Sequence, residues 1–225
     1  MVPGYVRTAH GSCLVEMGRT RVICTASFVE GVEKWRKGTG LGWVTAEYAM
    51  LPASTGSRKP RPVARPDGRS VEIQRLIGRV LRGVVAFERL GENTFFLDCD
   101  VLEADGGTRT AAINGAYVAL ALAARRCAAS GKCQRGVVRG QVAAVSVGLA
   151  GGRAVLDLNY AEDSTAEADL NLAMTAEAKF VEVQGTAERG AFDGRQLAAM
   201  LRLGAKGIRK VLAVQRQAIR RGART

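Results

Sequence analysis

Residues 106–109 read Gly-Gly-Thr-Arg and combine the residue types that bind an anion at the start of a helix. A strand-like run precedes them, and an alanine-rich stretch typical of a helix follows. Glycines let the main chain turn tightly, and the free N–H groups and dipole of a helix start attract an anion. The Arg109 guanidinium adds a planar charged fork that suits phosphate oxygens. The run predicts a site for inorganic phosphate, and its simpler interpretation is an ordinary turn with a polar helix cap.

A second run, residues 161–169, supplies two carboxylates, Asp163 and Asp169. One straight strand would separate them by roughly 20 Å, and one helix would turn them to different faces. A turn between antiparallel strands would bring them face to face. Such a pair suits Mg²⁺, or Mn²⁺ in its place, and alternatively one protonated carboxyl could act as a general acid. The simpler interpretation is a solvated acidic turn in a protein that binds RNA without reacting.

The helices and strands expected around these two runs indicate an α+β protein of two related units, residues 1–139 and 140–225. In the first unit we expect a hairpin at 12–29, strands at 43–50 and 94–104, a helix at 70–90 capped by Ser70, and a helix at 108–129. In the second we expect a hairpin formed by 140–148 and 154–160, strands at 170–174 and 179–184, and a helix from 193 to about 220.

The charge of the chain favours a polyanionic partner. Its 33 lysines and arginines exceed its 21 acidic residues, giving a net charge of +12, which favours nucleic acid over a membrane surface. Residues 51–69 hold four of the five prolines and should form a stiff basic loop. We expect RNA contacts from its cations Arg58, Lys59, Arg61 and Arg65, although a solvated linker would look the same.

Several classes of protein are disfavoured by composition. The five cysteines form no C-x-x-C pair and the chain has one histidine, which argues against a disulfide framework, a zinc site and a Ser-His-Asp triad. No apolar run approaches the roughly 20 residues that span a bilayer, and the start shows no signal-peptide pattern. We therefore expect a cytoplasmic protein with reduced thiols and no membrane partner.

Longer motifs around these residues resemble the ribonuclease PH family of phosphate-dependent 3′ exoribonucleases. The matching stretches are residues 42–52, 68–79, 98–111, 162–164, 169–171 and 181–188. They are long, occur in the family's order and cover almost the whole chain. The resemblance implies a ribosomal protein S5 domain 2-like α+β unit followed by the family's second α+β unit. It also implies a homohexameric ring built as a trimer of dimers.

The resemblance further implies a reaction in which inorganic phosphate attacks the last phosphodiester of RNA. The products are a nucleoside diphosphate and an RNA one nucleotide shorter, the substrate is a tRNA or rRNA precursor, and the reverse reaction adds nucleotides. Mg²⁺ would neutralise charge at the leaving oxygen. The family's phosphate-binding residues correspond to Arg69, Gly107, Thr108 and Arg109. Its catalytic, metal-associated carboxylates correspond to Asp163 and Asp169.

Two features depart from the family pattern. Family members usually begin with a further segment that contains Arg-x-Asp-Gly-Arg and a first strand, whereas the match here begins near Gly4. Without that strand we expect the neighbouring strand to have an exposed edge. The loop after residue 52 lacks the family's Thr-His-Thr-Arg element, which affects the grip on RNA or a subunit contact. The alternative function is a non-catalytic RNA-binding subunit of an exosome-like ring, which would not need the phosphate arginines or the carboxylate pair.

Overall fold

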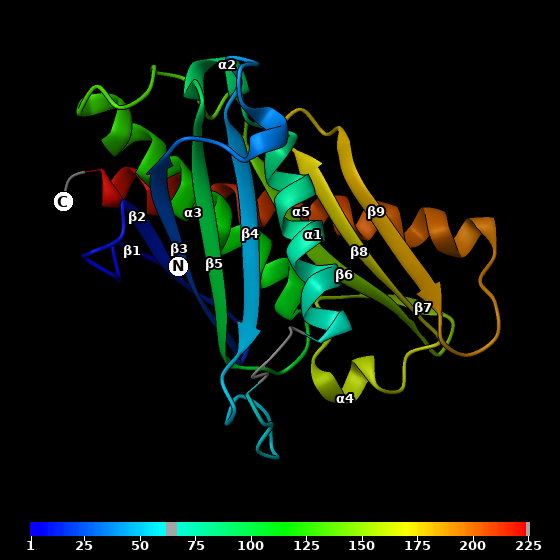
Figure 1. Cartoon of the computed structure of the whole chain (residues 1–225). Helices are drawn as coiled ribbons and strands as arrows, with labels where there is room; N and C mark the ends of the chain where they lie inside the picture. Colours follow the sequence, from blue (N-terminus) through cyan, green and yellow to red (C-terminus); the bar gives the residue numbers. More distant parts are fainter. Residues whose placement is uncertain (62–66, 224–225) are drawn as a thin grey trace.

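The computed structural model describes residues 1–61 and 67–223, which form two β-sheets with helices between and around them (Figure 1). The first sheet has the strand order β1-β2-β3-β5-β4, in which only the pairing of β4 with β5 is parallel. Its strands are β1 (Val2–Pro3), β2 (Gly11–Met17), β3 (Thr20–Glu30), β4 (Trp43–Met50) and β5 (Asn93–Glu103). The edge of β2 that we expected to be exposed is covered by β1 at Cys13 and Leu14.

The second sheet has the order β7-β6-β8-β9 and is antiparallel throughout. Its strands are β6 (Val142–Ala150), β7 (Arg153–Leu156), β8 (Ala168–Thr175) and β9 (Phe180–Ala187). The helices are η1 (Lys34–Arg36), α1 (Gly68–Arg82), α2 (Phe87–Leu90), α3 (Thr108–Ala129), α4 (Tyr160–Asp163) and α5 (Gly194–Gly222). None of the helices within 1–61 and 67–223 is long and apolar enough to cross a membrane.

Helix α3 lies between the two sheets and packs against β2, β3 and β5 on one side and β6 on the other. Most of its residues are buried, as expected of a helix that is apolar on all sides. Its buried Asn114 makes two hydrogen bonds to the main chain of β6: Nδ2 donates to the Ala144 carbonyl and Oδ1 accepts from the Ala144 N–H, both at 2.8 Å. This amide pair fixes the start of α3 against the second sheet.

Helix α5 covers the opposite face of the second sheet. Leu170 and Leu172 of β8 point toward it and share a buried cluster with Met200, Ile208 and other side chains. Helix α5 runs through Gly204 and Gly207 without a break. A side chain at Gly204 would collide with Leu172, so close packing explains this glycine.

Three expectations about local structure were wrong. The helix expected at 70–90 is two helices, because α1 ends at Arg82 and α2 begins at Phe87. Ser70 does not cap α1. Asp67 does, accepting from the Ser70 N–H at 2.8 Å, since an aspartate placed before the first turn can reach the free N–H groups. The hairpin strand expected to reach Tyr160 ends at Leu156, and Tyr160 begins α4 instead. The domain boundary at 139–140 stays a prediction.

Candidate active site

A cleft of about 590 Å³ lies where the loop after β4, the start of α3, the helix α4 and the second sheet meet. Figure 1 shows α4 at the lower end of the molecule. Residues from both sequence segments described above, 106–109 and 161–169, line the cleft. Its walls include all six residues that we expected to bind phosphate or to carry the catalytic carboxylates, namely Arg69, Gly107, Thr108, Arg109, Asp163 and Asp169. The fold therefore brings together residues from α1, α3, α4 and β8.

The two glycines before α3 have conformations that other residues avoid. Gly106 and Gly107 have φ angles of 80° and 57°, a region in which a Cβ is strained. A Cβ on Gly106 would also collide with the Leu158 carbonyl. Gly107 is the N-cap of α3, and among the described residues no side chain caps the first N–H groups of the helix. These donors, with the helix dipole behind them, are suited to an anion in the cleft.

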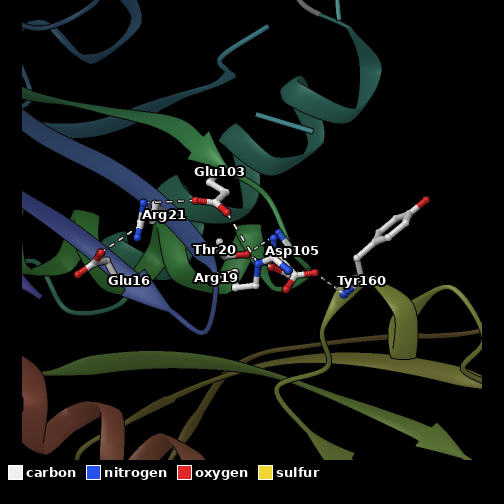
Figure 2. Close-up of polar contacts among 8 residues, drawn as sticks. Glu16, Arg19, Thr20, Arg21, Glu103, Asp105 and Tyr160 are labelled. Carbon is white, nitrogen blue, oxygen red and sulfur yellow. Dashed lines mark hydrogen bonds and ion pairs between the residues drawn. The ribbon is translucent and has the colours of Figure 1, made fainter. Parts of the chain in front are cut away.

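A hydrogen-bond chain ties the glycine turn to α4 (Figure 2). The Thr20 hydroxyl donates to the Gly106 carbonyl at 2.6 Å and accepts from the Asp105 N–H at 2.8 Å. Asp105 Oδ1 in turn accepts from the Tyr160 N–H at 3.2 Å. Because Tyr160 begins the helix that ends at Asp163, this chain sets the position of one carboxylate relative to the anion-binding turn. The Tyr160 ring points away from the turn and is 68% exposed.

Arg109 is held by a carboxylate that sequence reasoning missed. Its Nη2 donates to Glu72 Oε2 at 2.9 Å, and the other oxygen of Glu72 accepts from Gln184 Nε2 at 3.1 Å. These three residues, which we call the Arg109 clamp, come from α3, α1 and β9, so the clamp joins two helices to the second sheet. Arg109 Nε is buried and has no hydrogen-bond partner within the described residues. The clamp therefore leaves part of the guanidinium for an additional acceptor.

The two carboxylates occupy different elements from those expected. Asp163 ends the short helix α4 and Asp169 lies on β8, whereas we expected a plain turn between two strands. The helix forms because Asn159 and Glu162 make a capping box at its start. Burial raises the pKa of Asp169 above its ordinary value, the Asp163 charge raises it further, and Arg109 opposes both. Neither carboxylate forms an ion pair within the described chain.

A polar row on the second sheet also lies at this cleft, and the sequence argument missed it. Ser146, Asn171 and Gln184 are direct neighbours across β6, β8 and β9. Ser146 and Asn171 line the cleft, and the Ser146 hydroxyl is buried without a partner in the part of the chain that the structure describes. The sequence did contain a signal for Asn171. Side chains two residues apart on a strand share a face, and Asn171 follows Asp169 by two positions.

The basic loop does not act as one unit. Lys59 lines the cleft, and so does Arg69, which lies in the first turn of α1 rather than in the loop. Arg58 and Arg61 are exposed and do not line it. The charge of Arg61 instead acts on Asp100 of β5, whose pKa is raised by burial and by Asp98. Arg65 lies outside the described residues, so its expected RNA contact stays a prediction.

The carboxylate pair is compatible with a divalent metal ion. Within residues 1–61 and 67–223 no group of three or more His, Cys, Asp or Glu side chains is arranged to hold a metal. Glu188 also lines the cleft. The residues that would hold a metal ion are Asp163 and Asp169. Mg²⁺ is commonly bound in this way, with substrate oxygens and water completing its coordination. Burial and the Asp163 charge raise the pKa of Asp169. Because neither carboxylate forms an ion pair within the described residues, a cation would neutralise their negative charge.

Comparisons with known proteins identify the family and the fold. Residues 1–125 match the model of the 3′ exoribonuclease family, domain 1, and residues 140–207 match domain 2 of the same family. A chain of the Archaeoglobus fulgidus exosome with RNA bound to the active site is similar at 21% identity and a TM-score of 0.81, over 93% of this chain and 85% of that one. Rice (Oryza sativa) Rrp46 is similar at 16% identity and a TM-score of 0.76, over 97% of this chain and 92% of that one.

An archaeal exosome core chain is similar at 21% identity and a TM-score of 0.76, over 96% of this chain and 85% of that one. At these identities the solved structures establish the α+β fold of two units, and the family models, which together cover most of the chain, establish its membership. With both domain models matched in order around one cleft, the chain belongs to the 3′ exoribonuclease family of RNase PH proteins.

Proposed function

We propose that this protein is a phosphorolytic 3′-to-5′ exoribonuclease that trims tRNA precursors and releases nucleoside diphosphates. The observation that carries the proposal is the cleft itself, where an anion-binding helix start with Arg109 lies in the same cavity as the carboxylates Asp163 and Asp169. A protein that only binds RNA needs basic groups but has no use for a half-buried Asp169 placed where the charge of the exposed Asp163 acts against it.

In the proposed reaction an oxygen of inorganic phosphate attacks the phosphorus of the last phosphodiester. The bond from that phosphorus to the 3′-oxygen of the preceding ribose breaks, and this oxygen leaves as the new 3′-hydroxyl after taking a proton. The α3 N–H groups, Arg69 and Arg109 would hold the nucleophile and reduce its repulsion from the RNA phosphate. Because two anions must be held together, positioning should supply much of the rate.

Asp163 and Asp169 are the residues that would hold Mg²⁺, or Mn²⁺ in its place. The metal ion would supply stabilisation of negative charge near the leaving oxygen. In the alternative role, Asp169, whose pKa is raised by burial and by the Asp163 charge, would donate the proton instead of holding the metal ion. The family likeness supports assembly as a homohexamer, a trimer of dimers, with the cleft of each copy available to RNA.

The test is a time course of a 3′-extended tRNA with Mg²⁺, with and without inorganic phosphate. We expect shortening only with phosphate, with nucleoside diphosphates as the products. Monophosphates, or shortening that ignores phosphate, would contradict phosphorolysis. A folded protein that binds the RNA and never shortens it would instead support the alternative, a non-catalytic subunit of an exosome-like ring.

A pair of arginine variants assigns the site. Arg109→Gln should remove phosphate-dependent activity, because the substitution deletes a charged donor in the cleft. Arg139→Gln makes the same charge change at an exposed position that does not line the cleft, and should behave as the unmodified protein. Equal activity in the two variants would show that Arg109 does not bind the phosphate.

A further inference from the structure

Helix α5 presents an unbroken band of positive charge. Its 29 residues contain no Asp or Glu. At 100° per residue its cations fall on one arc of the helix, opposite the buried Met200, Ile208 and Leu212. The arc runs about 39 Å at 1.5 Å per residue. Its members are Arg195, Arg202, Lys206, Arg209, Lys210, Arg216, Arg220 and Arg221.

These cations are not neutralised within the described part of the chain. None of them forms an ion pair there. Arg216 donates to the Gln141 side-chain oxygen and Arg221 donates to the Met1 carbonyl, both neutral acceptors. Like charges four residues apart, as in Arg202, Lys206 and Lys210, repel one another on a helix. An anionic partner would remove this repulsion.

A second feature continues the band. At the C-terminal end of α5 a hollow of about 760 Å³ is lined by Gly222 and Ala223 together with Arg7, Arg125 and Arg126. No Asp or Glu is among its lining residues. A charged helix face is often only solvated, but here the positively charged face of α5 continues into a hollow that is also lined by arginines.

We propose that the basic tract, defined as the eight α5 cations and this arginine-lined hollow, binds the phosphodiester backbone of RNA outside the cleft. The tract lies away from the cleft, because Asp169 and Asn171 line the cleft whereas Leu170 and Leu172 point to α5. It therefore holds a part of the RNA other than the 3′ end under attack.

The chemistry of the tract favours RNA backbone over other anionic partners. The apolar side of α5 is buried in the core, so the helix cannot insert into a membrane as an amphipathic anchor does. The helix also lacks an aromatic side chain on which an unstacked base could lie. A long row of Arg and Lys without aromatic groups contacts phosphates and does not read sequence.

The test measures binding in the absence of inorganic phosphate, so that its outcome does not depend on phosphorolysis. The probe is a fluorescent RNA hairpin whose 3′ end is blocked by a phosphate. The tract variant is R202Q/K206Q/R209Q/K210Q, and the matched control K34Q/K37Q/R139Q/R153Q removes the same four charges from exposed positions elsewhere. Both variants lower the net charge of +12 by four.

We expect the tract variant to bind the hairpin at least about tenfold more weakly and to lose about three units of salt slope, since each phosphate contact contributes about 0.7–0.9. The control variant should keep nearly the original hairpin affinity and salt slope. If the chain is a phosphorolytic enzyme, both variants should shorten a short single-stranded RNA at the normal rate. Equal hairpin affinity in the two variants would overturn the proposal. So would a tract variant that binds less to anionic vesicles but equally to RNA, or one whose only change is its oligomeric state by light scattering.

Discussion

Replacing Glu72 by alanine is expected to lower kcat/KM for inorganic phosphate about tenfold. Glu72 fixes one Arg109 nitrogen at 2.9 Å and is itself fixed by Gln184 at 3.1 Å, so alanine frees the guanidinium to leave the geometry that a phosphate needs. A hydrogen bond to a charged group contributes about 1.5–3 kcal/mol. Because the Glu72 side chain is 37% exposed, the lower end applies, and about 1.4 kcal/mol corresponds to tenfold.

The Glu72 charge has an opposite effect that must be separated from positioning. A carboxylate near the cleft repels phosphate, by about 1 kcal/mol or less where water screens it. Glu72→Gln removes this charge and keeps an oxygen for Arg109. Its new amide group meets Gln184, whose Oε1 is buried without a partner among the described residues and can accept from it. We therefore expect the glutamine variant to retain kcat/KM for phosphate or to exceed the original value slightly.

The assay is initial-rate phosphorolysis of a short RNA with phosphate varied at saturating RNA, at low and at high salt. Salt should reduce any gain from charge removal and leave the positioning loss, since screening acts on charge. Thermal unfolding of both variants checks that each is folded. If alanine and glutamine both improve phosphate use, Glu72 acts through its charge and not by positioning Arg109, and the reasoning fails.

Three further predictions concern the surroundings of the cleft. Thr20→Val should lower the free energy of unfolding by about 1–3 kcal/mol, because it leaves the Asp105 N–H and the Gly106 carbonyl without their hydroxyl partner; urea unfolding measures this, with Thr20→Ser expected to keep most of the stability. Asp163→Asn should abolish phosphorolysis and lower the pKa of Asp169, because a like charge is removed; carboxyl NMR titration of the metal-free protein reports the shift, and an unchanged Asp169 pKa would show that the two do not interact. Asp157 has a φ of 58°, and its pKa is raised above 3.8 by burial and, to a smaller extent, by the Glu162 charge. The folded protein therefore binds a proton at Asp157 more tightly than the unfolded chain does, and it loses stability as the pH rises above 3.8 and this carboxyl ionises. Asp157→Asn, which tolerates this φ, should therefore stabilise the protein at pH 7 and lose that advantage below about pH 3.8, as followed by urea unfolding across pH; an advantage equal at both pH values would refute the charge argument.

The strands and helices were largely predictable because their signals are local. The expected bounds of the strand at 43–50 and of the helix at 108–129 coincide with β4 and α3, since alternation and an uninterrupted alanine-rich run are read from neighbouring residues. The helix expected at 70–90 was too long, because its apolar pattern continues after Gly83 although the main chain turns there. The cap at Asp67 was missed because Ser70 is an equally good candidate by residue type.

The amino-acid sequence by itself determined which chemical groups are present. The Gly-Gly-Thr-Arg turn opens a helix, the two aspartates lie on either side of a short connection, and α5 carries cations without a single carboxylate. These properties follow from residue type and short spacing. They were sufficient to identify the family and to predict an anion site in the first unit.

Only the tertiary structure decided how those groups meet. Glu72 contacts Arg109 across 37 positions and Gln184 across 112, and these pairs depend on how α1 packs between the first sheet and β9. The same packing turns Asp169 toward Arg109 and turns Leu170 toward α5. Side chains that are distant in the chain become neighbours only after burial of apolar surface has chosen one arrangement of the layers. For that reason the Arg109 clamp and the polar row on the second sheet could not be derived from local pattern.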